Sequence, residues 1–258
     1  MLEGRTAIVT GASEGVGRGI ATCLAAHGAN VAVVARTDAK VEAFAQHLCA
    51  IHGEGRAVAI AADVSTAEGC QRVVDTASKI WEKVDILVNN AGRPAHRPFL
   101  ENDDEEWQGD YELKVLAVVR LARLLVPLMR RTGGGRILNI LSTGAKSSPA
   151  GTSPTAITRA GGLSLTKLLA NEFAKDKILV NALLLGRVKS DQWVRAWTAN
   201  GQPGTLDGYY EELGKKVPLG RFAEPEEVGE FAAFLLSDAA SYLTGAGINF
   251  DGGMSPVS

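Results

Sequence analysis

Residues 6–17 read Thr6-Ala7-Ile8-Val9-Thr10-Gly11-Ala12-Ser13-Glu14-Gly15-Val16-Gly17, an apolar run that leads into a glycine-rich turn. The run is short enough for a buried strand, and an interval typical of a helix separates it from a second apolar run at residues 31–34. Two such strands with a helix between them indicate a right-handed βαβ unit. Glycines at this position allow a tight turn and let backbone N–H groups approach a diphosphate. The stretch therefore predicts a dinucleotide-binding unit.

Apolar runs recur along the chain and are too continuous to alternate, as is typical of strands buried on both faces. They lie at 57–61, 84–88, 136–141, 178–183 and 248–250. Helix-length segments fill the gaps; one follows a capping box from Ser65 to Glu68, and another opens at Pro225. Seven strands alternating with helices predict an α/β fold with a Rossmann-type doubly wound parallel sheet and three αβα layers.

The chain shows no linker or internal repeat, so a single dinucleotide-binding domain is expected over residues 1–258. Residues 189–216 lack the strand and helix rhythm, and we expect them to form a mobile flap over the site. The composition is that of a soluble globular protein, with 27 Lys and Arg against 29 Asp and Glu and a net charge of −2. No basic stripe favours nucleic acid or membrane as a partner.

Cysteines and histidines give no sign of a disulfide framework or a metal site. Cys23, Cys49 and Cys70 lack C-x-x-C spacing and are expected to be reduced and structural. The four histidines include no H-E-x-x-H pattern, so no bound metal is expected. The first residues do not resemble an export signal, and no apolar stretch is long enough to span a membrane, which favours a cytoplasmic location.

Three further motifs accompany the glycine turn: Asp63-Val64, Asn89-Asn90-Ala91-Gly92, and Thr244-Gly245 leading to Asp251-Gly252-Gly253. With them the chain resembles the classical short-chain dehydrogenase/reductase family over essentially its whole length. The resemblance implies a small-molecule carbonyl or alcohol substrate and a homotetramer built through the long helices that contain Lys114 and Arg159. It also implies a set of cofactor-binding residues: Gly11, Ser13, Gly15, Val16, Gly17, Arg36, Asp63, Val64, Asn90, Ala91, Gly92, Arg159, Gly186 and Val188.

The end of the second strand indicates which dinucleotide binds. An acidic residue there would accept both ribose hydroxyls and repel a 2′-phosphate, but the position holds Ala35. Arg36 follows, and a guanidinium can grip a phosphate and stack on adenine, so NADP(H) is favoured and NAD(H) is possible. A solvated arginine is the simpler reading. Glu14 argues against NADP(H), because many NADP(H)-using relatives carry a basic residue within the glycine turn.

The catalytic positions depart from the family pattern, which has Ser, Tyr, Lys and Asn. Alignment of the motifs puts Ser142 at the serine, Thr155 at the tyrosine, Arg159 at the lysine and Lys114 at the asparagine. An aliphatic hydroxyl is a much weaker acid than a phenol, and general acid catalysis is commonly worth ~10²–10⁴ in rate. Arg159 could stabilise a developing alkoxide but is a poor proton shuttle.

Other side chains could donate the proton, and each has a simpler reading. Lys114 could reach into the site or merely pair with a carboxylate. His96 titrates near neutrality but could be an ordinary loop histidine. Tyr209 and Tyr210 could act on closure of the flap or simply wall a pocket.

The leading hypothesis is an NADP(H)-dependent oxidoreductase that interconverts a ketone and a secondary alcohol. In it Ser142 orients the oxygen, and Arg159, aided by Thr155 or water, replaces the usual relay. One alternative is a catalytically silent NADP-binding protein, because the fold needs only the glycine turn and its partners to retain the nucleotide. Another is a non-redox lyase or hydrolase, similar to the family's halohydrin dehalogenase branch. That branch also has Arg for Lys, but it keeps the tyrosine and loses the glycine turn.

Overall fold

Seven parallel strands form the central sheet, as the sequence predicts, in a computed structural model that describes residues 1–258. Their order is β3-β2-β1-β4-β6-β8-β9. The chain builds outward from β1 to β3 and then crosses back to β4, so the order reverses between β1 and β4. The strands are β1 (Thr6–Thr10), β2 (Asn30–Ala35), β3 (Ala57–Ala61), β4 (Ile86–Asn89), β6 (Gly135–Ser142), β8 (Ile178–Leu185) and β9 (Gly247–Phe250).

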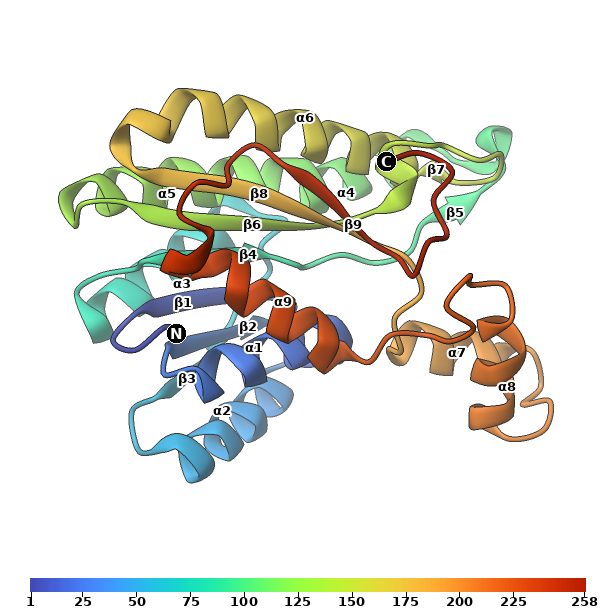
Figure 1. The fold of residues 1–258 in the computed structure, drawn as a ribbon, viewed down its shortest axis with the longest axis horizontal. Helices are drawn as coiled ribbons and strands as arrows, with labels where there is room; N and C mark the ends of the chain where they lie inside the picture. The colour runs from blue at the N-terminus through green and yellow to red at the C-terminus, as the bar shows by residue number, and fades with distance from the viewer.

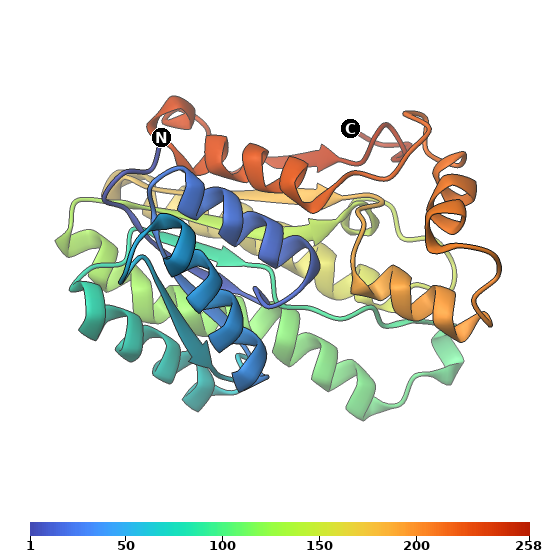
Figure 2. The ribbon, with the colours of Figure 1, turned by 90° about the horizontal axis from the view of Figure 1, so that it is seen from below.

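Helices cover both faces of the sheet and give the expected three layers (Figures 1 and 2). One face packs against α1 (Gly15–Ala26), α2 (Asp38–His52) and α9 (Pro225–Leu236), around a core cluster of 27 buried apolar residues. The other packs against α3 (Ala67–Trp81), α5 (Ala117–Arg131) and α6 (Thr155–Phe173), around a cluster of 23. Burial on both faces explains why the strands read as continuous apolar runs.

Several short elements complete the chain. Strands β5 (His96–Arg97) and β7 (Ser153–Pro154) form a small antiparallel pair that the sequence did not indicate. Helix α4 (Asp104–Tyr111) precedes α5. Single 3₁₀ turns occupy Phe99–Glu101, Thr143–Ala145, Ala174–Asp176 and Asp238–Ala240.

Two local expectations are corrected by the structure. Helix α3 is capped by Thr66 rather than Ser65: the Thr66 hydroxyl accepts from the N–H of Gly69 at 3.0 Å, whereas the Ser65 hydroxyl donates to Asp63 at 2.7 Å. The segment at 189–216 is not without regular structure. It contains α7 (Asp191–Ala199) and α8 (Leu206–Gly214), which stand apart from both helical layers in Figures 1 and 2. By contrast, α9 begins at Pro225 as predicted.

Between α4 and α5 the chain makes one π-helical turn, η2 (Glu112–Leu116), so the three elements run on as one long helix. π-helical turns are rare in proteins, and many of those that occur lie at functional sites. Lys114 lies in the middle of this turn, and its side chain is completely buried. The π-turn thus brings a charged side chain into the interior of the protein.

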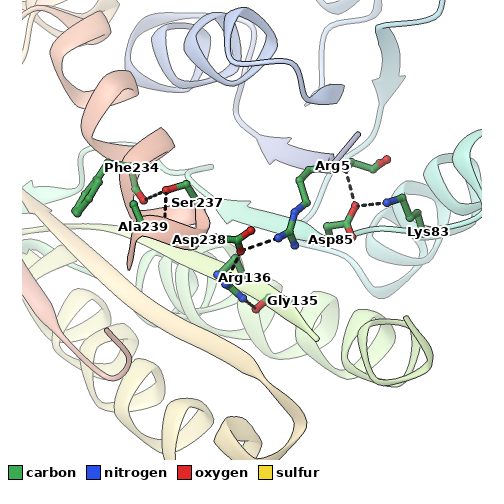
Figure 3. A network of polar contacts seen from close by, with 10 residues as sticks. Arg5, Lys83, Asp85, Gly135, Arg136, Phe234, Ser237, Asp238 and Ala239 are labelled. Carbon is green, nitrogen blue, oxygen red and sulfur yellow. Dashed lines mark hydrogen bonds and ion pairs between the residues drawn. The ribbon is translucent and has the colours of Figure 1, made fainter. Parts of the chain in front are cut away.

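A polar network ties the amino ends of the strands together (Figure 3). Asp238, just after α9, accepts from Arg5 at 2.8 Å and pairs with Arg136 at 3.3 Å. Asp85 accepts from the N–H of Thr6 at 2.8 Å. These contacts fasten α9 and the loop before β4 to the starts of β1 and β6, and leave the carboxyl ends of the strands free to build a site.

No helix has the length and the apolar character needed to span a bilayer. No group of three His, Cys, Asp or Glu side chains is arranged to hold a metal ion. The three cysteines are free, as expected. Burial raises the pKa of Cys23 to about 12 and that of Cys70 to about 11, so both thiols are protonated and unreactive at neutral pH.

Candidate active site

A cavity of about 1180 Å³ opens where the strands end, at the reversal of strand order between β1 and β4. Every residue assigned to cofactor binding from the sequence lines it, although the residues come from distant parts of the chain. They are Gly11, Ser13, Gly15, Val16, Gly17, Arg36, Asp63, Val64, Asn90, Ala91, Gly92, Arg159, Gly186 and Val188. Ser142, Thr155 and His96 line the same cavity.

The glycine turn is shaped to admit a large ligand against its backbone. Gly11 and Gly15 have φ values of 63° and 52°, in the region that favours glycine. A Cβ atom on Gly17 would lie 2.2 Å from the carbonyl oxygen of Gly11, so only glycine fits. The Asn90 amide fastens this turn to the end of β4 by donating to the carbonyl oxygens of Thr10 and Gly11, both at 3.0 Å. These features fit a dinucleotide whose diphosphate sits at the start of α1.

Within the glycine turn, the negative charge of Glu14 is balanced by positively charged side chains of the protein. Its carboxylate pairs with Lys40 and lies 3.8 Å from Arg195. Arg36 is exposed directly after β2 and makes no ion pair. A guanidinium is therefore available for a phosphate at this corner, and the acidic residue of the turn has its own partner.

Thr155 begins α6 and is 5% exposed, on the cavity wall. Its hydroxyl oxygen accepts two hydrogen bonds, from Lys114 Nζ at 2.8 Å and from the backbone N–H of Ala95 at 3.0 Å. A hydroxyl oxygen has two lone pairs and one proton. With both lone pairs engaged, the proton of Thr155 is free to be donated to a molecule in the cavity.

Lys114 does not line the large cavity; it lies behind Thr155. Its ammonium group forms an ion pair with Asp110 at 2.5 Å, one helical turn earlier, and both side chains are fully buried. Asp110 also accepts from the Thr158 hydroxyl at 2.6 Å. Burial and the nearby charge of Arg159 lower the pKa of Lys114 to about 8, although Asp110 opposes that shift.

Arg159 lies one helical turn after Thr155 and is partly buried. Its Nη1 donates to the carbonyl oxygen of Ile140 at 2.6 Å, and its Nη2 would be 2.7 Å from a Cβ atom on Gly92. Burial lowers its pKa to about 10, so it stays positively charged near neutral pH. It has no carboxylate within ion-pair distance, and its charge is therefore available to the contents of the cavity.

The other candidate proton donors are less suitable. His96 lines the cavity, but desolvation and the charge of Lys114 lower its pKa below the usual range, so its ring is neutral at pH 7. Neither Tyr209 nor Tyr210 lines the cavity. Tyr210 is 8% exposed and packs edge-to-face on Phe222, with ring centroids 5.2 Å apart.

Asp110 and Arg93 were not found by sequence reasoning. The spacing of Asp110 and Lys114, four residues apart on an expected helix, was the available signal for the first of them. Arg93 follows Asn-Asn-Ala-Gly and lines the cavity with its guanidinium over Gly109, 3.6 Å from where a Cβ atom would lie. No pattern in the sequence predicts that Arg93 lies next to helix α4, which contains Gly109.

Comparisons with known proteins agree with this architecture. The family described as Enoyl-(Acyl carrier protein) reductase matches residues 11–255. Oxidoreductase UcpA of Salmonella typhimurium is 37% identical over 254 residues, covering 98% of this chain and 95% of the relative. The 3-oxoacyl-[acyl-carrier-protein] reductase FabG of Escherichia coli is 34% identical over 255 residues, covering 99% of each chain.

Solved structures resemble the chain as closely. L-sorbose reductase from Gluconobacter frateurii, complexed with NADPH and L-sorbose, superposes with a TM-score of 0.95 at 36% identity, and the match covers 100% of this chain and 98% of that one. The 3-ketoacyl-(acyl-carrier-protein) reductase from Brucella melitensis, complexed with NADH, gives a TM-score of 0.87 at 33% identity, covering 99% and 100%. The chain has a doubly wound sheet with a glycine turn where the strand order reverses, and the matches cover almost the whole of both chains. It therefore belongs to the short-chain dehydrogenase/reductase family of oxidoreductases.

Proposed function

We propose that the protein is an NADP(H)-dependent oxidoreductase that interconverts a ketone and a secondary alcohol, with a lysine and a threonine as its proton relay. The observation that carries the proposal is the contact of Lys114 Nζ with the Thr155 hydroxyl oxygen at 2.8 Å, on the wall of the dinucleotide-sized cavity. This contact places the titratable ammonium group of Lys114 behind the Thr155 hydroxyl, whose own proton can be donated into the cavity.

The residues of the cavity fit the cofactor. The glycine turn would hold the diphosphate, Asp63 and Val64 the adenine side, and Arg159 with the Asn90 loop the nicotinamide side. When bound, the nicotinamide supplies or accepts the hydride. NADP(H) is favoured because Arg36 is unpaired and free to bind a 2′-phosphate. The glycine turn still carries Glu14 rather than a basic residue, but the pairing with Lys40 offsets the negative charge of Glu14.

The protein's own contribution is to place the substrate oxygen and move one proton. Ser142 donates a hydrogen bond that orients the carbonyl oxygen, and Thr155 donates its hydroxyl proton to that oxygen as negative charge develops there. Lys114 replaces the proton on Thr155 Oγ1 and becomes a neutral amine, for which a pKa of about 8 is well suited. Oxidation of an alcohol runs through the same atoms in reverse.

Asp110 and Arg159 have supporting tasks in this scheme. Asp110 holds the Lys114 ammonium in line with Thr155, through a fully buried ion pair. Arg159 stabilises the developing alkoxide and holds the cofactor's ribose, while its high pKa keeps it from acting as a shuttle. The relay thus differs from the leading hypothesis drawn from sequence, in which Arg159 had the main part.

Cofactor binding and turnover test the proposal separately. NADPH is added to the purified protein, and we expect enhanced, blue-shifted nicotinamide fluorescence that saturates. Loss of absorbance is then followed with a panel of ketones and aldehydes, where we expect turnover of at least one class. Saturable binding without turnover of any compound would favour a silent dinucleotide-binding protein, and absence of binding to both NADPH and NADH would refute the proposal altogether.

A further inference from the structure

We infer that the substrate carries an anionic group, a carboxylate or a phosphate, in addition to its carbonyl or alcohol, and that Arg93 binds this group. The inference rests on the proposed function and narrows the substrate class of the same site. It follows from the charges that surround the Thr155 hydroxyl.

The wall of the cavity near Thr155 has an excess of positive charge. Arg93 and Arg159 line this part of the cavity, and Lys114 lies directly behind Thr155. Asp110, which pairs with Lys114, is the one carboxylate paired with any of these three cations, so the group carries a formal charge of +2. The carboxylates that do line the cavity are Glu14, Asp63 and Asp191, and they lie on the cofactor side. The Asp191 carboxylate, for example, is 4.0 Å from where a Cβ atom on Gly15 would lie.

The directions of two pKa shifts agree with this excess. Burial is the largest cause lowering the pKa of Lys114 and of His96. The charges of Arg159 and Arg93 lower the pKa of Lys114 further, and those of Lys114 and Arg159 lower the pKa of His96, whereas Asp110 raises both. Positive charges held close together in a partly desolvated site repel one another, which raises the free energy of the empty site. A bound anion lowers this repulsion, so the site favours an anionic ligand.

Among the cations near Thr155, Arg93 is the one with none of its donors engaged within the protein. Arg159 donates to the carbonyl of Ile140, and Lys114 is held by Asp110 and Thr155. Arg187, elsewhere on the cavity wall, donates to the carbonyl of Leu213 at 2.7 Å and lies over the Trp193 ring at 5.6 Å.

Arg93 itself is exposed and makes neither an ion pair nor a side-chain hydrogen bond. Its Nη2 lies 3.6 Å from where a Cβ atom on Gly109 would be, so the guanidinium is close to helix α4, which also carries Asp110. A planar guanidinium with free donors is suited to a carboxylate or phosphate, which it can bind through two parallel hydrogen bonds.

A matched control lies four residues away. Arg97 belongs to the same segment, is more than half exposed, and is paired with Glu106. It does not line the cavity. Replacement of Arg97 by Gln removes the same charge from the same neighbourhood without touching the proposed anion site.

The test compares pairs of ketones in which one member carries an anionic group and the other does not. We would measure kcat/KM with NADPH for 4-oxopentanoate against its methyl ester, and for dihydroxyacetone phosphate against dihydroxyacetone. One anionic member is expected to exceed its neutral partner, and the pair that shows this distinguishes carboxylate from phosphate. Arg93→Gln is expected to reduce that preference by about 10- to 100-fold, the range for a hydrogen bond to a charged group. Arg97→Gln should leave it unchanged.

Equal kcat/KM within both pairs would overturn the inference while leaving the proposed function intact. The same holds if Arg93→Gln and Arg97→Gln reduce the preference equally, because general electrostatics would then explain it. If NADPH binds and no compound is turned over, the proposed function fails, and titration calorimetry of the same four compounds with the NADP⁺ complex decides the inference. Tighter binding of an anionic member that is lost in Arg93→Gln supports it, and equal binding within both pairs refutes it.

Discussion

Replacing Thr155 by Val removes the hydroxyl that links Lys114 to the cavity and keeps the shape of the side chain. The change removes one of the two partners of the buried Lys114 Nζ, which keeps Asp110, and the acceptor of the part-buried N–H of Ala95. We expect a total loss of about 1–3 kcal/mol of folding stability. In the proposed relay it also removes the donor to the substrate oxygen, and general acid catalysis of this kind is worth ~10²–10⁴ in rate. We therefore expect kcat for ketone reduction to fall by about 10²- to 10⁴-fold, with NADPH affinity nearly unchanged. Thr155→Ser keeps the hydroxyl and is the matched control.

The pH dependence gives the same prediction a second readout. Reduction needs Lys114 protonated, and its pKa is lowered to about 8 by burial and by Arg159. The kcat/KM for reduction should be constant at lower pH and fall about tenfold per pH unit above that pKa, whereas oxidation of the alcohol should rise toward it and then level off. NADPH absorbance at saturating cofactor measures both directions. A folded Thr155→Val protein that reduces ketones within about threefold of the wild-type rate, with the same break in its pH profile, would refute the relay.

Three other outcomes follow from the structure. Arg36→Gln should weaken NADPH binding by about 10- to 100-fold and NADH binding by less than about twofold, measured by fluorescence titration; an unchanged ratio would contradict the phosphate assignment. Gly17→Ala should abolish cofactor binding, because the added Cβ would lie 2.2 Å from the Gly11 oxygen, whereas Gly161→Ala has its nearest neighbour at 3.6 Å and should bind normally. The pKa of Lys114 is lowered in the folded state from its ordinary 10.5 to about 8, so the unfolded state binds more protons between these two pH values. The free energy of unfolding of the wild-type protein should therefore rise with pH over this range relative to that of Lys114→Met. The expected rise is up to about 3 kcal/mol, measured by urea titration at several pH values. A constant difference between the two proteins over that range would show that Lys114 is not desolvated.

The sheet and the cofactor side of the cavity were predictable because local patterns determine them. The strands are buried on both faces, so their apolar runs stand out, and the glycine turn needs φ values and a close approach that only glycine allows. Both features lie within a few residues of the pattern that reveals them. Asn90 was assigned differently, from the family resemblance of its Asn-Asn-Ala-Gly motif, because its amide contacts Thr10 and Gly11 from a distant part of the chain.

The catalytic side was harder to predict because its contacts join distant segments. Lys114 and Thr155 are 41 residues apart, and their hydrogen bond depends on how α6 packs against the π-turn. A prediction from residue spacing assumes a regular α-helix around Lys114, so it cannot show that the π-turn directs the Lys114 side chain toward Thr155. Tyr210 is a candidate donor from sequence because it lies in the segment expected to close over the site, but in α8 it packs against Phe222.

In the proposed relay, the π-turn at Glu112–Leu116 makes the direction of the Lys114 side chain, and with it the source of the proton, depend on the number of residues in the helix. In a regular α-helix each residue advances the side-chain direction by about 100°, so deleting one residue before Lys114 would swing its ammonium group about a quarter of the way round the helix, away from Thr155. No side chain at the site would have been exchanged, yet the reservoir of protons would be gone. Insertions and deletions in this helix can therefore alter the chemistry of the fold as decisively as a substitution in the cavity.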